Sequence, residues 1–310
     1  MKAIFFDQVT KIYSDGFKGK KIALDQLTLE VHQGEIFGFL GPNGAGKSTA
    51  IKILLNILFP TSGRAYLLGQ PVTDKTIRRK VGYLPENPYF YDHLTPEELL
   101  WFGGKTSGLI PTQIRERADK LLSMVDLDHV RQRPLRTFSK GMVQRAGLAL
   151  ALVNDPDVVI LDEPMSGLDP LGRKLISDIM RKLKEQGKTV FFSSHILHDV
   201  EDLCNRIGII VEGLLRLTAS LTDLLSTPPK GWRITVRGNK EALASQSDRA
   251  SWKLSTTGGL TEIQAQEIDL YKLLEQVKRL KCEVVAVVPL RETLEEIFLR
   301  EIQKAGVKPL

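Results

Sequence analysis

The chain has 310 residues, 42% of them hydrophobic, and its 43 basic and 37 acidic side chains leave a net charge of +6. A single domain usually has about 100 to 200 residues, so we expect one principal domain with a sizeable core and a smaller companion. The positive charge is spread along the chain, so it is only weak evidence for nucleic-acid binding. The sequence contains no run of about 18 apolar residues, so no membrane-spanning helix is predicted.

The cysteines and the N-terminus predict a cytosolic chain. Cys204 and Cys282 stand far apart without zinc-site spacing, which fits a reducing compartment. The opening MKAIFFDQVT has its apolar run interrupted by Asp7, which indicates a strand and not a secretory signal. Any membrane role would therefore require a separate spanning partner.

The first half of the chain predicts strands, a glycine-rich loop and then helices. The apolar start and a period-two pattern over residues 27–31 predict antiparallel strands. Residues 35–41, EIFGFLG, predict a buried strand, and a helix is expected over residues 47–58. The pattern over residues 95–125 has a period near 3.6 and places a helix within an insert of about residues 88–153.

The second half predicts alternating strands and helices. A strand over residues 158–161 is followed by a helix over residues 171–185, two further strands and a short helix, which is typical of a parallel, helix-covered sheet. Residues 227–231, TPPKG, cannot continue a helix and are the candidate linker. We predict an α/β domain over residues 1–226 and a small α+β domain over residues 227–310.

A phosphate-binding motif lies between the predicted buried strand and the helix after it. GPNGAGKS matches G-x-x-x-x-G-K-[ST], in which backbone N–H groups and the helix N-terminus surround phosphate oxygens. Lys47 is expected to neutralise phosphate charge, and the Ser48 hydroxyl is expected to bind Mg²⁺. The motif alone does not choose among kinases, GTPases and motor ATPases. Its predicted nucleotide-binding residues are Gly41, Pro42, Asn43, Gly44, Ala45, Gly46, Lys47, Ser48 and Thr49.

Two adjacent carboxylates end the strand VVIL. Asp162 is the expected acidic contact of Mg²⁺, a hard cation that prefers oxygen ligands. Glu163 follows at once and is predicted to polarise the attacking water as a general base. An arbitrary glutamate at a strand end would face solvent, but the LDEP context favours a catalytic role.

A second anion-binding helix end is predicted downstream, in FSKGM. Ser139 is the expected N-cap, so its hydroxyl and the N–H groups near Gly141 can meet an anion. One site does not need two such helices. The sequence therefore indicates an ATPase that works in pairs.

These motifs, in this order over roughly residues 4–219, resemble the nucleotide-binding subunit of an ATP-binding cassette (ABC) transporter. The resemblance implies a P-loop ATPase fold and two ATP molecules, each sandwiched between the glycine loop of one subunit and the serine-glycine signature of the other. It implies ATP and Mg²⁺ as cofactors, a second ATP-binding subunit expected to form a homodimer, and an integral membrane permease on a separate chain. Nucleic acid is not an expected partner. The chain would lie peripherally at the cytoplasmic face of the cell membrane.

The resemblance also implies roles for single residues. Tyr13 would stack on adenine, with Phe17 as a nearby competitor, and His195 would contact the γ-phosphate as a catalytic residue beside Glu163 and Lys47. The residues implied in the turn that communicates across the dimer are Ser166, Gly167, Leu168 and Asp169.

The chain departs from the family pattern in three places. Glu86 stands where a glutamine usually contacts the metal and the attacking water, so it is the third predicted metal contact after Ser48 and Asp162. In the signature, Lys140 and Met142 replace the usual first glycine and the glutamine.

The coupled process is predicted from weaker features. Aromatic side chains of residues 89–91 and 101–102 are expected near the groove where the family's permeases dock, although aromatic clusters are more often core. The tail LRETLEEIFLREI resembles the C-terminal end of cassette subunits that serve bacterial exporters.

The alternative function is that of a soluble ABC ATPase acting on ribosomes or nucleic acid, which the pI of 9.2 slightly supports. Such proteins commonly join two cassettes, and this sequence has one. A non-hydrolysing scaffold is disfavoured because no catalytic residue is lost.

Overall fold

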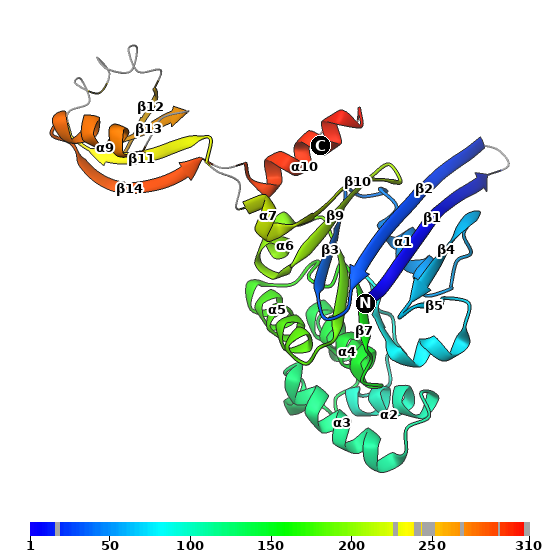
Figure 1. Ribbon diagram of the computed structural model, residues 1–310. Helices are drawn as coiled ribbons and strands as arrows, with labels where there is room; N and C mark the ends of the chain where they lie inside the picture. Colours follow the sequence, from blue (N-terminus) through cyan, green and yellow to red (C-terminus); the bar gives the residue numbers. More distant parts are fainter. Residues whose placement is uncertain are drawn as a thin grey trace. The chain divides into compact units, whose positions relative to one another are not determined.

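In the computed structural model the chain forms two compact units (Figure 1). Unit 1 comprises Met1–Leu221 and Phe298–Leu310, and unit 2 comprises Thr222–Ile297. The structure describes residues 1–15, 19–225, 229–238, 243, 252–266, 270–290 and 292–306. The predicted division after residue 226 falls outside these residues, so it stays a prediction, and so does part of the predicted linker.

An antiparallel sheet opens unit 1, as the sequence predicted. Its strands are ordered β2-β1-β4-β5. Leu27, Leu29 and Val31 of β2 point to one face and are buried, which accounts for the period-two pattern. The strands are β1 (Lys2–Asp15), β2 (Gly19–His32), β4 (Ser62–Leu67) and β5 (Gln70–Pro71).

A second, mostly parallel sheet forms the centre of unit 1, in the order β10-β9-β3-β8-β7-β6. Its three central strands are buried along their whole length, because helices and the antiparallel sheet cover both faces. The strands are β3 (Ile36–Leu40), β6 (Val81–Leu84), β7 (Val158–Asp162), β8 (Thr189–Ser194), β9 (Arg206–Val211) and β10 (Leu214–Ser220), the last antiparallel to β9.

Seven α-helices accompany these strands among the described residues between 47 and 225. They are α1 (Lys47–Leu54), α2 (Pro96–Thr106), α3 (Pro111–Met124), α4 (Lys140–Leu152), α5 (Pro170–Glu185), α6 (Leu197–Leu203) and α7 (Leu221–Leu225). Figure 1 shows α2 and α3 together at the end of the unit remote from β1 and β2, which is the predicted insert. None of the helices in the described parts of the chain has the length and apolar character to span a membrane.

Two predicted helix bounds were wrong. The helix expected over residues 47–58 ends at Leu54, because Asn56 takes a left-handed φ of 53° that a helix cannot contain. The pattern over residues 95–125 is two helices. The first of the two, α2, ends just before Gly108, which has a left-handed φ of 84°, and Pro111 is the first residue of the second, α3.

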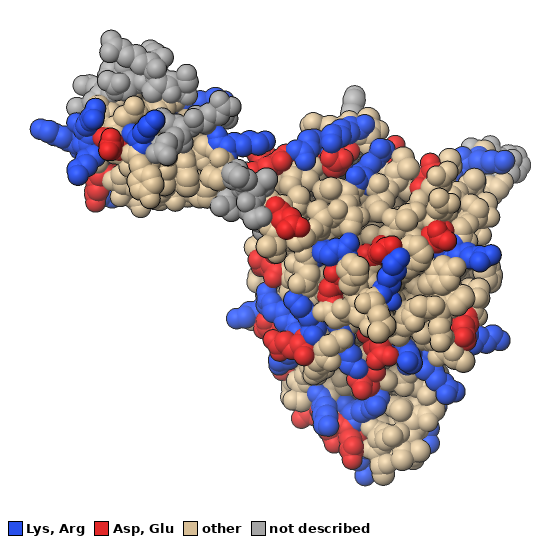
Figure 2. Space-filling view, in the orientation of Figure 1, with Lys and Arg blue, Asp and Glu red and all other residues tan. Residues whose placement is uncertain are grey.

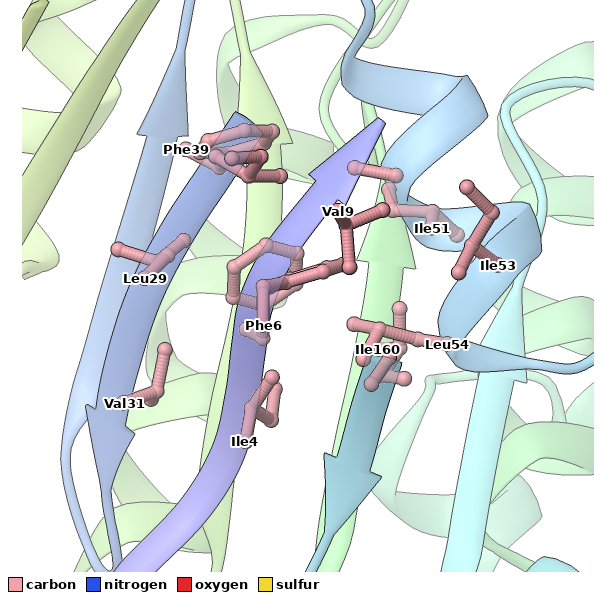
Figure 3. Packing of buried hydrophobic residues seen from close by; sticks show 14 of the residues in the cluster. Ile4, Phe6, Val9, Leu29, Val31, Phe39, Ile51, Ile53, Leu54 and Ile160 are labelled. Atoms are coloured by element: carbon pink, nitrogen blue, oxygen red, sulfur yellow. The ribbon is translucent and has the colours of Figure 1, made fainter. Parts of the chain in front are cut away.

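The core of unit 1 lies between the two sheets and α1. Figure 3 shows Phe6 of β1, Ile51 of α1 and Ile160 of β7 packed into one cluster, and all three are fully buried. Phe39 joins the cluster from β3 and lies with its ring centroid 5.5 Å from that of Phe191. The helix after the glycine loop is therefore fixed against both sheets.

Unit 2 is a four-stranded antiparallel sheet with the order β12-β13-β11-β14. Helix α9 (Leu270–Arg279) contributes Leu273 and Val277 to a small core with Ile234 and Ile263. Its strands are β11 (Gly231–Arg237), β12 (Lys253–Thr257), β13 (Leu260–Gln266) and β14 (Glu283–Leu290). The last helix among the described residues is α10 (Leu294–Lys304), whose residues from Phe298 on belong to unit 1.

Candidate functional site

Three neighbouring strands end at the same level and bring three motifs together. In β3 and β8, Leu40 pairs with Ser194, and in β7 and β8, Asp162 pairs with Ser193. The residues that follow these strand ends are the glycine loop, Glu163 and His195. Parallel strands meet with their carboxyl ends at one edge, which is where ligands of open α/β sheets bind.

Close backbone approach requires glycine at two positions of the loop. A Cβ at Gly41 would lie 2.4 Å from the Ile210 carbonyl oxygen, and one at Gly46 would lie 2.4 Å from that of Ala23. Gly46 also has a φ of 111°, which side-chain-bearing residues rarely adopt. The buried Lys47 donates from Nζ to the Gly41 carbonyl at 2.6 Å, so the loop curls around its own lysine.

Glu163 is held between two nitrogen groups. Its Oε1 lies 3.2 Å from Lys47 Nζ, and its Oε2 lies 2.8 Å from His195 Nδ1. The residue is 7% exposed and has a left-handed φ of 48°, a conformation that a non-glycine residue adopts at an energetic cost. The strained backbone aims the carboxylate at the lysine of the phosphate loop.

Asp162 has a different environment from the glutamate beside it. The Ser193 hydroxyl donates to Asp162 Oδ1 at 2.6 Å and accepts from the Glu163 N–H at 2.9 Å. Burial, with a smaller contribution from the negative charge of Asp162, raises the pKa of Tyr83 to about 12. Ser193 thus links the Asp162 carboxylate to the Glu163 backbone, and the two carboxylates have different partners.

One cavity of about 550 Å³ gathers most of the predicted site. Its predicted lining residues are Tyr13, Pro42, Asn43, Gly44, Ala45, Gly46, Lys47, Ser48, Thr49, Glu86, Glu163, Ser166 and His195. Gly41 and Asp162 are buried and do not line it. Lys21 and Ala23 of β2 also line it and were missed. Lys21 pairs with Tyr13 across the hairpin, and alternation places Ala23 on the same face, but the hairpin register shifts several times, so the period-two pattern alone does not reveal this pairing.

Tyr13 lies at the rim of this cavity. Its side chain is 40% exposed, and Lys11 Nζ lies 5.3 Å from the centre of its ring. The ring is therefore available for stacking and already contacts a cation. The competing residue Phe17 lies outside the described residues.

A second cavity of about 630 Å³ holds the signature. As predicted, Ser139 is the N-cap of α4, and its Oγ accepts from the Met142 N–H at 3.2 Å. Asp169 caps α5 by accepting from the Gly172 N–H at 2.8 Å. The predicted residues Ser139, Gly141 and Asp169 line this cavity, together with Lys140, Met142, Gly167 and Leu168. Arg145, which also lines it, was missed.

The turn after Glu163 connects the two cavities. Ser166 lines the first, and Gly167, Leu168 and Asp169 line the second. The structure thus does not bring Ser139 and Gly141 to the glycine loop of the same chain. It places the glycine loop and the Ser139 helix end in separate cavities, which are joined by one turn.

The aromatic residues of the insert lie at the surface. Tyr89 is 94% exposed, Tyr91 68%, Phe102 57% and Trp101 40%, whereas Phe90 is half-buried. These four side chains are therefore not part of a core, and their expected role in permease docking stays a prediction.

The sequence and structure match known proteins along most of the chain. Residues 24–166 match the family model described as ABC transporter. An ABC transporter ATP-binding protein of Synechocystis sp. is 42% identical over 308 residues, which cover 97% of this chain and 84% of that protein. The Nod factor export ATP-binding protein I of Cupriavidus metallidurans is 39% identical and covers 66% of this chain and 67% of its own length. A dimeric ATP-binding cassette in a post-hydrolysis state, bound to ADP and Pi, matches with a TM-score of 0.66 at 27% identity, over 70% of this chain and 98% of that one.

Proposed function

The chain belongs to the ABC transporter ATP-binding proteins, and on this premise we propose that its ATPase drives export through a separate membrane permease. It binds and hydrolyses ATP as its family does. The observation that carries the site assignment is the position of Glu163 between Lys47 Nζ and His195 Nδ1. A relative that matches over about two thirds of each chain is named for export of Nod factor, and this name supports export as the direction of transport.

We propose that the 550 Å³ cavity binds the nucleotide. The loop N–H groups and Lys47 would take the phosphates, and Tyr13 the base. The phosphates would then compete with the Glu163 carboxylate for Lys47 Nζ, which has three N–H donors and already gives one to the Gly41 carbonyl oxygen. The released carboxylate can accept a proton from water, while His195 remains beside it to contact the terminal phosphate.

The residues around the cavity fit Mg²⁺. Mg²⁺ prefers oxygen ligands, keeps several waters and is usually bound through one or two carboxylates plus substrate phosphates. Asp162, Ser48 and Glu86 offer only oxygen donors, and the described residues contain no cage of three or more His, Cys, Asp or Glu. These three residues would hold the ion, which would supply positive charge at the phosphates.

We infer that two identical chains complete each site. The Ser139 helix end and the glycine loop open into different cavities of one chain. In a two-fold dimer the signature of one chain can cover the nucleotide in the loop of the other. The dimeric cassette bound to ADP and Pi supports this arrangement.

Tyr13→Ala is expected to weaken ATP and GTP alike. Base stacking is worth about 1 to 3 kcal/mol and does not depend on the identity of the base, so affinity should fall roughly 5- to 150-fold for both. Equilibrium binding of each nucleotide measures this. Tyr89→Ala, at an exposed position outside the cavity, is the control and should change neither. Unchanged affinity in Tyr13→Ala would remove the residue from the site.

Tyr91→Glu is expected to release the permease while nucleotide binding stays intact. Tyr91 is 68% exposed in the aromatic surface of the insert, and a carboxylate there would be buried unpaired in a docked complex. Co-purification of the membrane partner measures the effect. Ile57 is similarly exposed, at 63%, and lies outside this surface, so Ile57→Glu should leave co-purification unchanged. Equal recovery with both variants would reject the docking role.

The same purification tests the membrane location of the chain and the alternative function, a soluble ATPase that acts on ribosomes or nucleic acid. We propose a peripheral position at the cytoplasmic face of the cell membrane. Recovery with a membrane protein that is insensitive to RNase, together with ATP-dependent transport by the purified pair, would support export. RNase-sensitive recovery with ribosomes would overturn it.

A further inference from the structure

At one edge of the unit 2 sheet, strand β14 carries Pro289 near its end and a register shift against β11 beside Val285, but it has few charges. Strand β14 is the outer strand next to β11, and seven residues in a row, from Val284 to Leu290, carry no charge. The side chains of Val284, Val285, Val287 and Val288 are 40%, 47%, 38% and 48% exposed. Figure 1 shows β14 along the rim of its sheet, and the surface there is mostly tan in Figure 2.

The opposite edge of the same sheet is protected. Strand β12 has five residues against eight in β14, and its exposed residues are Lys253, Ser255, Thr256 and Thr257. Short length and polar or charged side chains are the usual means by which proteins block pairing at a sheet edge. The contrast within one sheet marks β14 as the edge that is suited to pairing.

The sequence of the strand favours a second copy of itself. Residues 284–288 read VVAVV, a palindrome centred on Ala286. In an antiparallel pair with its two-fold axis at this alanine, Val284 lies opposite Val288 of the second copy, and Val285 lies opposite Val287. Directly opposed β-branched side chains stabilise a pair of strands, and a two-fold contact uses the same patch on both chains.

We propose that two copies of this chain pair through β14, joining their unit 2 sheets into one. The four half-exposed valines offer roughly 200 Å² of apolar surface per copy, against about 800 Å² per partner in a stable interface. The contact is therefore weak alone. It acts as a second contact in a dimer that ATP already holds together. In that dimer the two β14 strands belong to one complex, which raises the effective concentration of each strand for the other. This last step rests on the proposed ATP dimer, but the pairing itself does not.

Cysteine cross-linking at the two-fold axis tests the pairing. The Cα atoms of directly opposed residues lie about 4.5 to 5.5 Å apart, within the range that a disulfide spans. Ala286→Cys in a Cys282→Ser background should give a covalent dimer on mild oxidation. Thr257→Cys on β12, in the same background, carries the same remaining Cys204 and should give only background. Equal yields at the two edges would overturn the proposal.

A charge on the strand tests its contribution to the ATP dimer. Val288 lies opposite Arg233, which also pairs with Glu262 at 3.2 Å, so Val288→Glu places its carboxylate beside a cation of its own sheet and should fold. In a Glu163→Gln background with ATP, we expect the dimer dissociation constant to rise about tenfold, a loss of about 1.4 kcal/mol. Thr257→Glu should leave it unchanged. An unchanged constant in Val288→Glu would overturn the contribution of β14. If Glu163→Gln itself forms no ATP-dependent dimer, the proposed function fails, and the cysteine experiment still decides the pairing of β14.

Discussion

Glu163→Gln is expected to hydrolyse ATP about 10² to 10⁴ times more slowly than the native chain while binding ATP at least as well. Glutamine keeps the shape of the side chain and can still contact Lys47 and His195. It cannot take a proton from water. It also removes the negative charge 3.2 Å from Lys47 Nζ, so the lysine is freer to meet phosphate.

Phosphate release at saturating ATP and equilibrium ATP binding separate the two effects. Glu201→Gln, the same change at an exposed position of α6, should alter neither measurement. Steady-state phosphate release near the native rate would show that Glu163 is not the base. Loss of ATP binding would show instead that its ion pair with Lys47 supports the loop.

The elements that carry the site could be predicted because their signals are local. The glycine loop follows one short apolar strand, and the two carboxylates follow another. Each motif therefore indicates the secondary structure next to it. The cap at Ser139 was predicted for the same reason. Such caps depend on backbone groups within one turn of the residue.

The contacts within the site could not be predicted in this way. Lys47, Glu163 and His195 are far apart in the sequence. The strand order β3-β8-β7 brings Lys47 and His195 each within 3.2 Å of the Glu163 carboxylate. Lys21 was missed because its place depends on a long hairpin whose register shifts several times. The end of α1 was misplaced because apolar side chains continue past Asn56, whose left-handed backbone the hydrophobic pattern does not reveal.

The separation of the two cavities leads to the second large effect. Chains carrying Lys47→Ala lack the phosphate ligand of the loop, and chains carrying Ser139→Asp keep a good N-cap but place a negative charge where the terminal phosphate must bind. Each variant alone is expected to be inactive. A mixture in equal amounts should recover about a quarter of the native ATPase activity, because half of the dimers are mixed and each mixed dimer has one intact site of two.

The design distinguishes shared sites from any other form of cooperation. Ser139→Asn is a neutral cap of similar size to aspartate, so it should lose much less activity than Ser139→Asp if charge at the phosphate is the cause. A chain that carries both Lys47→Ala and Ser139→Asp, mixed with native chain, leaves no intact site in the mixed dimers, because each of its two pockets contains one altered half. Recovery in the first mixture and none in the mixed dimers of the second requires that each nucleotide contacts both chains. An inert first mixture, or a strictly monomeric chain with full activity, would mean that one chain suffices and that the Ser139 cavity has another purpose.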